Sequence, residues 1–348
     1  LAYRGNDHES LLALLSKGGR LLVVRIAADD VAGDHPIITE LPQPKGVVTA
    51  LALDALLENL YVGTADGQVV HVALSETESP EMRAAYTVAA SSTAVTTLGF
   101  LSGDRSLVVM TADGAVSTWG LVRRADAPSG WTLIQIHTLR AHNAPVTAFA
   151  PSQRVKGFVT GDRKGNLFLH HATSSQTLLR LATSEFPIRA VAFAPKGDGL
   201  IALDGAGQLS LYQVQNAYPE VTLETLFGKV WYEGYDQPAH VWQSSSGSDD
   251  VEPKLGLLPL AFGTLKGTMY ALFLAVPIAI LAAMCTSQFM HQDLRAKIKP
   301  IIEVMAALPT VVLGFLAGLG LAPLLERMLP AVAGMALVVF VFAAVLMM

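Results

Sequence analysis

Four polar residues of the front half have side chains that could carry chemistry: His142, Asp162, His170 and His171. Histidine with aspartate serves in general acid–base catalysis and in metal binding. His170 and His171 are adjacent in an alternating apolar run that predicts a strand, so their side chains point to opposite faces and cannot share a metal. The chain has no GxSxG, HExxH or CxxC motif. We therefore expect surface or blade-packing histidines, and no catalytic, cofactor-binding or metal-binding residues.

These side chains belong to a β pattern that repeats along residues 1–225. Five alternating apolar runs each fold back at a glycine, and the turn glycines follow one another at intervals of 42 to 51 residues: Gly19, Gly67, Gly114, Gly165 and Gly207. Period-two alternation around such turns predicts β-hairpins. A repeat of about 40–50 residues with several strands per unit predicts the blades of an all-β propeller.

A second repeated element precedes the turns, as in "APVTAFAP" and "IRAVAFAP". These segments resemble the WD-repeat family, in which a blade opens with Gly-His and its third strand ends in Trp-Asp. Here His142 follows Ala141, and Trp119 is followed by Gly120. We therefore expect the structural polar network of those repeats to be mostly absent. Closed propellers often have more than five blades, so we expect one or more further blades before Leu1.

The rear of the chain is apolar. Asp, Glu, Lys and Arg are absent between Lys266 and Asp293, from Val304 to Leu325 and from Ala331 to Met348. Because about 20 residues at 1.5 Å each cross the hydrocarbon, such runs predict membrane-spanning helices. We expect spans at about 257–284, 302–325 and 329–348, so the fold class is a multi-domain chain of all-β propeller followed by all-α spans. Three buried helices of a soluble protein are the alternative.

Residues 226–253 are expected to link the propeller to a membrane domain at 254–348. The Ser/Gly/Asp run at 244–250 is typical of a flexible segment. Four aromatic residues fit either membrane-interface anchors or a loop packed on the propeller: Trp231, Tyr232, Tyr235 and Trp242,. The net charge of −5 gives no electrostatic argument for nucleic acid, and the single cysteine, Cys285, excludes a disulfide within the chain,.

Charge predicts the orientation. The segment "HQDLRAKIKP" between the first two spans holds Arg295, Lys297 and Lys299 against Asp293. The positive-inside rule places this loop in the cytoplasm. The first span then runs from outside to inside, so the propeller lies on the outer face, which is the periplasm in a Gram-negative cell.

The apolar half resembles the start of the permease core of PstC-type phosphate ABC transporters. The resemblance covers residues 254–348, and its motifs are "PLAFGTLKG", "AVP", "LRAKIKP" and "IIEVMAALPTVVLG". It implies structural or gating roles for six motif residues: Gly263, Thr264, Pro277, Glu303, Pro309 and Gly314. The front half resembles the large extra domain that some proteobacterial members carry.

The resemblance implies a multi-pass permease subunit of the bacterial inner membrane that imports inorganic phosphate. Because no GxxxxGK[ST] motif occurs, ATP must be hydrolysed by another chain,. The implied partners are a second permease subunit, cytoplasmic ATP-binding subunits, a periplasmic phosphate-binding protein and membrane lipid, with no nucleic acid. Lys266 fits a snorkelling lysine or an anion contact.

Pro309 should break or kink the second span, and Gly314 with Gly318 should let another helix approach closely. A broken helix suits alternating access, whereas a packing proline would have no gating role. The alternative from another class is a membrane-anchored propeller that senses or scaffolds other proteins and does not transport.

Overall fold

The computed structural model describes residues 1–7, 9–27, 36–74, 80–90, 93–125, 127, 130–243, 251–306 and 309–329. The chain forms two compact units, Leu1–Thr264 and Leu265–Met348. The first holds a series of antiparallel sheets, and the described part of the second is helical. The predicted fold class, a β-propeller array followed by helices, is confirmed. The third predicted span, 329–348, lies almost wholly outside the described residues.

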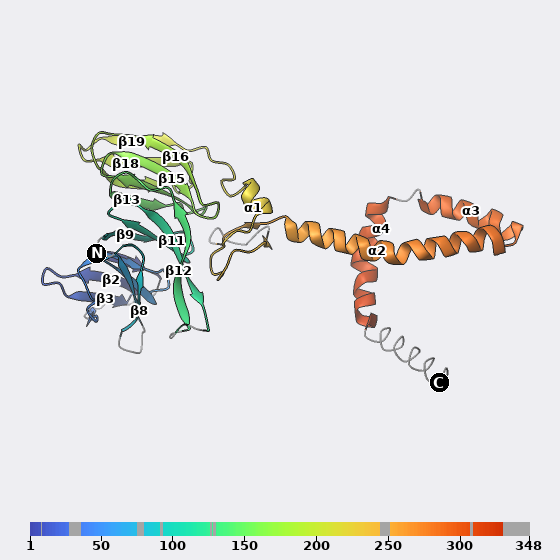
Figure 1. The fold of residues 1–348 in the computed structure, drawn as a ribbon, viewed down its shortest axis with the longest axis horizontal. Coiled ribbons are helices and arrows are strands. Elements are labelled where there is room, and N and C mark those ends of the chain that lie inside the picture. Colours follow the sequence, from blue (N-terminus) through green and yellow to red (C-terminus); the bar gives the residue numbers. More distant parts are fainter. Residues whose placement is uncertain are drawn as a thin grey trace. The chain divides into compact units, whose positions relative to one another are not determined.

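Five antiparallel sheets follow one another along the first unit, each meandering through consecutive strands (Figure 1). The first four have four strands each and the fifth has three. The first two sheets contain β1 (Ala2–Gly5), β2 (Glu9–Leu15), β3 (Leu21–Ala27), β4 (Ile37–Glu40), β5 (Val48–Leu53), β6 (Asn59–Thr64), β7 (Gln68–Ala73) and β8 (Glu81–Thr87). The other three contain β9 (Val95–Phe100), β10 (Ser106–Thr111), β11 (Val116–Arg123), β12 (Trp131–Leu139), β13 (Val146–Pro151), β14 (Gly157–Asp162), β15 (Asn166–His171), β16 (Gln176–Ala182), β17 (Ile188–Phe193), β18 (Gly199–Asp204) and β19 (Leu209–Gln213).

The repeated glycines lie where the sequence placed them, in the turn between the second and third strands of each sheet. All five have a positive φ, between 75° and 87°, a region that only glycine enters without strain. Gly165 is further restricted, because an added Cβ would collide with the carbonyl oxygen of Ser184. Glycine is therefore required here both by the backbone angle and by the neighbouring chain.

The turns share a second repeated feature, a polar capping side chain, which we did not predict from the sequence. The residue three positions before each turn glycine is polar, and in four of the five turns its side chain accepts the amide N–H four residues on: Ser16, Thr64, Asp162 and Asp204, at 2.8–3.1 Å. In the remaining turn Thr111 Oγ1 donates to the carboxylate of Asp113 at 2.5 Å. The first four contacts satisfy turn amides that would otherwise need water.

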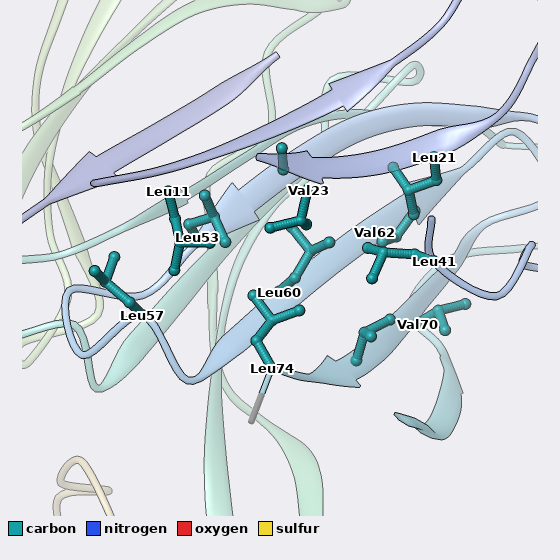
Figure 2. Packing of buried hydrophobic residues seen from close by; sticks show 12 residues of the cluster. Leu11, Leu21, Val23, Leu41, Leu53, Leu57, Leu60, Val62, Val70 and Leu74 are labelled. Atoms are coloured by element: carbon teal, nitrogen blue, oxygen red, sulfur yellow. The ribbon is translucent and has the colours of Figure 1, made fainter. Parts of the chain in front are cut away.

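The core of the first unit lies between the sheets rather than within one of them. Four apolar clusters separate the five sheets. Figure 2 shows the first, in which Leu11 and Leu21 from the first sheet meet Leu60 and Val62 from the second. All four side chains are fully buried, and burying each stabilises the array by about 1.5–3 kcal/mol. Each sheet needs its neighbours, as in a stacked repeat.

The chain between the fifth sheet and the first long helix packs on the first unit where it is described. It contains α1 (Leu223–Phe227), β20 (Trp242–Gln243) and β21 (Lys254–Leu255). Thr222 and Thr225 cap the start of α1 reciprocally,. Tyr232 is 1 % exposed, so this aromatic side chain packs inside the unit. Residues 244–250, which we predicted to be flexible, lie outside the described residues.

The helical elements are α2 (Leu258–Met284), the π-helical turn η1 (Cys285–Phe289), α3 (Gln292–Ala306), α4 (Thr310–Leu316) and the π-helical turn η2 (Ala317–Leu321). Helix α2 begins in the first unit and continues into the second. The helix that starts with α4 continues to Leu329.

Candidate functional site

Two helical stretches are long and apolar enough to cross a membrane, Leu258–Phe289 and Thr310–Leu329. Neither buries a residue among those described. Apolar side chains surround both helices, since Phe273 is 80 % exposed and Val311 is 81 % exposed. A helix that is apolar on all sides requires a lipid or protein covering. These stretches are therefore the candidate membrane-embedded site.

The break predicted at Pro309 is present. Helix α3 ends at Ala306 and α4 begins at Thr310, with Pro309 in an extended conformation (φ −59°, ψ 118°). The Pro309 carbonyl accepts the amides of Val312 and Leu313 at 3.0 and 3.2 Å, so this residue starts the new helix. The apolar helical stretch consequently begins at Thr310, eight residues after the start that we predicted for the second span.

The segment predicted as a loop between the spans is a helix. Helix α3 carries Arg295, Lys297 and Lys299 in its first half, and its apolar residues recur at helical spacing: Leu294, Ile298, Ile301 and Met305. This pattern is typical of an amphipathic helix that lies along a membrane surface. The Arg295 guanidinium also donates to the carbonyl oxygens of Ser287 and Met290. Arg295 thus caps the end of the preceding helix in addition to carrying charge,.

The six predicted motif residues lie on three helices. Gly263, Thr264 and Pro277 are in α2, Glu303 is in α3, and Pro309 and Gly314 are at and after the start of α4. An added Cβ on Gly263 or Gly314 would meet no atom within 4 Å, so no described segment uses the space that these glycines leave. Their structural or gating roles stay predictions.

Lys266 lies on α2 beside an aromatic ring. Its ammonium nitrogen is 5.7 Å from the centre of the Tyr270 ring, which is within the range of a cation–π contact. The snorkelling and anion-contact alternatives for Lys266 both stay predictions.

The polar residues singled out in the front half form a buried network in the fourth sheet. His142 Nδ1 lies 3.0 Å from Asp162 Oδ2, and His142 Nε2 lies 2.7 Å from Thr160 Oγ1. Thr160 Oγ1 in turn lies 2.9 Å from His170 Nε2. All four residues are at most 3 % exposed. The expectation that such a network is mostly absent is therefore wrong for this sheet.

The hydrogen-bond donors of this network can be assigned from the Asp162 carboxylate. Asp162 can only accept, so Nδ1 of His142 donates and Nε2 of the neutral ring accepts from Thr160. Burial lowers the pKa of His142, against the opposing effect of Asp162, and it lowers the pKa of His170 to about 3. His171 faces the other way, with Nδ1 2.9 Å from Ser174 Oγ, as the strand alternation predicted. These histidines pack between strands, and the described residues contain no cluster of three metal-ligating side chains.

A cavity of about 430 Å³ opens between the second and third sheets. Its wall is aromatic, with Tyr61, Phe100 and Trp131. The charged residues that line it are Asp54, Asp104, Arg105 and Arg123. Burial is the main cause of a raised pKa for the Asp104 carboxyl. This cavity could not be predicted from the sequence, because its residues come from separate repeats.

A sequence comparison finds a similar membrane protein. The chain is 30 % identical over 78 residues to the "Probable ABC transporter permease protein YqgH" of Bacillus subtilis strain 168. That match covers 22 % of this chain and 25 % of the relative, so the chain spans about a quarter of the length of the curated relative that it matches. No family profile matches the chain.

Solved β-propellers are similar to the chain in fold. The β-propeller domain of Myceliophthora thermophila Cps50 (Swd1) is 17 % identical with a TM-score of 0.49, covering 60 % of this chain and 68 % of that one. The WD40 β-propeller domain of Doa1 is 18 % identical with a TM-score of 0.44, covering 68 % and 69 %.

Proposed function

We propose that this chain is part of a membrane permease subunit of an ABC importer, with inorganic phosphate as the cargo. The observation that carries the proposal is the pair of uncovered apolar helices, Leu258–Phe289 and Thr310–Leu329, in a chain with sequence similarity to an ABC permease. Phosphate is inferred from the motif residues, among them Gly263, Glu303 and Pro309. The chain supplies the path, and a separate subunit hydrolyses ATP.

The proposed topology puts the propeller in the periplasm of a bacterial inner membrane. Arg295, Lys297 and Lys299 on the amphipathic helix α3 carry this part of the proposal, since cytoplasmic segments near spans are enriched in Lys and Arg. The proposed partners are a second permease subunit, cytoplasmic ATP-binding subunits and a periplasmic phosphate-binding protein. We propose residues 1–225 as the propeller domain and the permease domain from residue 254 onward.

A second candidate function is a membrane-anchored propeller that binds other proteins and transports nothing. The cavity between the second and third sheets favours it, because its aromatic wall could bind a side chain of a peptide,. Trp131 in this wall is 40 % exposed. This candidate gives no reason for the permease motif residues on α2, α3 and α4.

Uptake of radiolabelled phosphate by a strain that lacks the full-length gene tests the proposal. Loss of uptake, restored by the full-length gene and unaffected for sulfate, molybdate and amino acids, is the expected result. Loss of uptake of one of those other solutes would support an importer but contradict phosphate as its cargo. Normal uptake of all of them would reject the importer and favour the second candidate.

A further inference from the structure

Helix α3 is tied at both ends to the apolar stretches. It begins at Gln292, three residues after the first stretch ends at Phe289, and it ends at Ala306, four residues before the second stretch begins at Thr310. At about 3.5 Å per extended residue, the two connections reach about 10 and 14 Å. The Arg295 guanidinium fixes the first connection, because it donates to two carbonyl oxygens at the end of the preceding helix. Where both stretches cross a bilayer, α3 therefore lies at its surface.

One side of α3 is apolar and uncovered. Leu294, Ile301 and Met305 are each more than half exposed. Successive residues of a helix are turned by about 100°, so these three side chains and Ile298 lie within about 60° of one another. Pro300 withholds a backbone amide from the middle of this 15-residue helix, which weakens a helix that has to form without support. Helix α3 therefore needs a surface that covers its apolar side.

The charged residues of α3 are arranged around this apolar side. Measured from its centre, Lys297 and Arg295 lie about 70° and 90° away on opposite sides, and Lys299 lies about 130° away. The carboxylates of Asp293 and Glu303 lie about 110° and 170° away. Long basic side chains reach back toward a surface from such positions. The positive charges consequently border the apolar side, and Glu303 points away from it.

The two lysines are available to a ligand. Both are exposed, and neither has a hydrogen bond or an ion pair among the described residues. Asp293 faces His291 instead, with Oδ2 3.4 Å from Nδ1. With three basic and two acidic residues, the helix has a net charge of 3 − 2 = +1. An apolar layer bordered by negative groups complements this surface, and a bilayer that contains anionic phospholipid has this structure.

We propose that α3 is a binding site for anionic phospholipid. Its apolar side enters the boundary of the acyl chains, and Lys297 and Lys299 contact headgroup phosphates. The helix then holds the ends of both spanning stretches at a negatively charged leaflet. This site does not depend on which solute the helices transport.

Hydrogen exchange of the intact protein in nanodiscs tests the site. The rates compared are those of the backbone amides of α3, in nanodiscs of phosphatidylcholine alone and of phosphatidylcholine with one third phosphatidylglycerol. A basic residue at an anionic surface strengthens binding about fivefold, so two lysines should slow exchange by up to about 25-fold in the anionic nanodiscs. In the neutral nanodiscs exchange should stay fast, also after inorganic phosphate is added.

Two double variants separate the lysines of α3 from charge in general. Lys297→Gln/Lys299→Gln should lose most of the protection in anionic nanodiscs. Lys17→Gln/Lys45→Gln removes two exposed lysines from the propeller unit and should keep the protection. If the α3 variant does not insert, 0.5 M NaCl gives a second measurement on the wild type. It shortens the screening length to a few Å and should remove the protection of α3 but not that of α2.

Equal protection of α3 in both kinds of nanodisc would overturn the proposal, and so would protection that survives the loss of both lysines. Protection by inorganic phosphate in neutral nanodiscs would assign the lysines to the free anion and would also overturn it. Normal phosphate uptake without the full-length gene would reject the proposed cargo and leave the lipid site unaffected.

Discussion

The two units of this protein cover their apolar side chains in opposite ways. In the propeller array, Leu60 and Phe158 are fully buried between sheets, whereas Phe273 on α2 and Val311 on α4 are at least 80 % exposed. Alternation with period two turns half of each strand toward a neighbouring sheet. Each of the two long helices turns apolar groups in every direction, and no described segment covers them. The first unit buries its own apolar side chains, whereas those of the second require lipid or other helices to cover them.

The largest difference between the units should come from truncating an aromatic side chain in each. Phe158→Ala removes a fully buried ring between the third and fourth sheets and should destabilise the propeller by about 3–5 kcal/mol. Phe273→Ala, at an 80 % exposed position of α2, should leave the unfolding of the propeller unchanged. Urea unfolding followed by tryptophan fluorescence in detergent measures both. Equal destabilisation by the two variants would contradict the separation of the cores.

Introducing a charge should affect the helical unit strongly and the surface of the propeller little. Leu274→Asp, midway along the first spanning stretch, should oppose membrane insertion by about 2.5–3.5 kcal/mol. Leu211→Asp replaces a 71 % exposed leucine on β19 and should change stability by no more than about 0.5 kcal/mol. Carbonate extraction of membranes gives the inserted fraction of each. A fully inserted Leu274→Asp protein would show that α2 faces water or a polar partner.

Local signals in the sequence were sufficient for the repeat. The turn glycines are predictable because a left-handed backbone angle selects glycine directly, and Pro309 is predictable because proline cannot continue a helix. The start of the second span was not predictable. Ile302 and Val304 extend the apolar run of the sequence, but they belong to the amphipathic helix α3. Charge alone does not separate a surface-lying helix from the beginning of a span.

Long-range polar contacts could not be predicted from the sequence. His142 and His170 are 28 residues apart in the chain, and Lys156 and Glu233, whose charged groups lie 2.8 Å from each other, are 77 apart. Their pairing depends on how the fourth sheet meets its neighbours, which no local period encodes. A polar residue three positions before every turn glycine was visible in the sequence and would have identified the turn caps.

Acidification should also distinguish the two units, because the buried histidines are all in the propeller. Burial lowers the pKa of His71 and His171 to about 4 and that of His170 to about 3. The unfolded chain binds these protons near pH 6.5 and the folded propeller does not. Stability is therefore fully present above about pH 6.5 and is lost as the pH falls toward 4, by up to about 1.4 kcal/mol per pH unit and histidine.

Urea midpoints of the propeller at pH 7.0, 5.5 and 4.5 measure this slope, and His171→Gln should make it shallower. Both spanning stretches lack histidine, so their helical circular dichroism in detergent should not change over this range. A propeller midpoint that is constant from pH 7.0 to 4.5 would contradict the neutral, buried state of these rings.

The smallest expected change in stability comes from Pro309. Pro309→Ala supplies the amide donor that proline lacks and the residue with the highest helix propensity, so α3 and α4 can join into one helix. Stability and insertion should hold or rise slightly. If the break contributes to alternating access, phosphate uptake should fall severalfold in the full-length protein. Leu316→Ala is the matched control, because Leu316 is an exposed apolar residue of α4 and its replacement joins no two helices. Normal uptake by an inserted Pro309→Ala protein would make Pro309 a packing residue, leaving the transport role of the helical unit to be carried by residues other than this break.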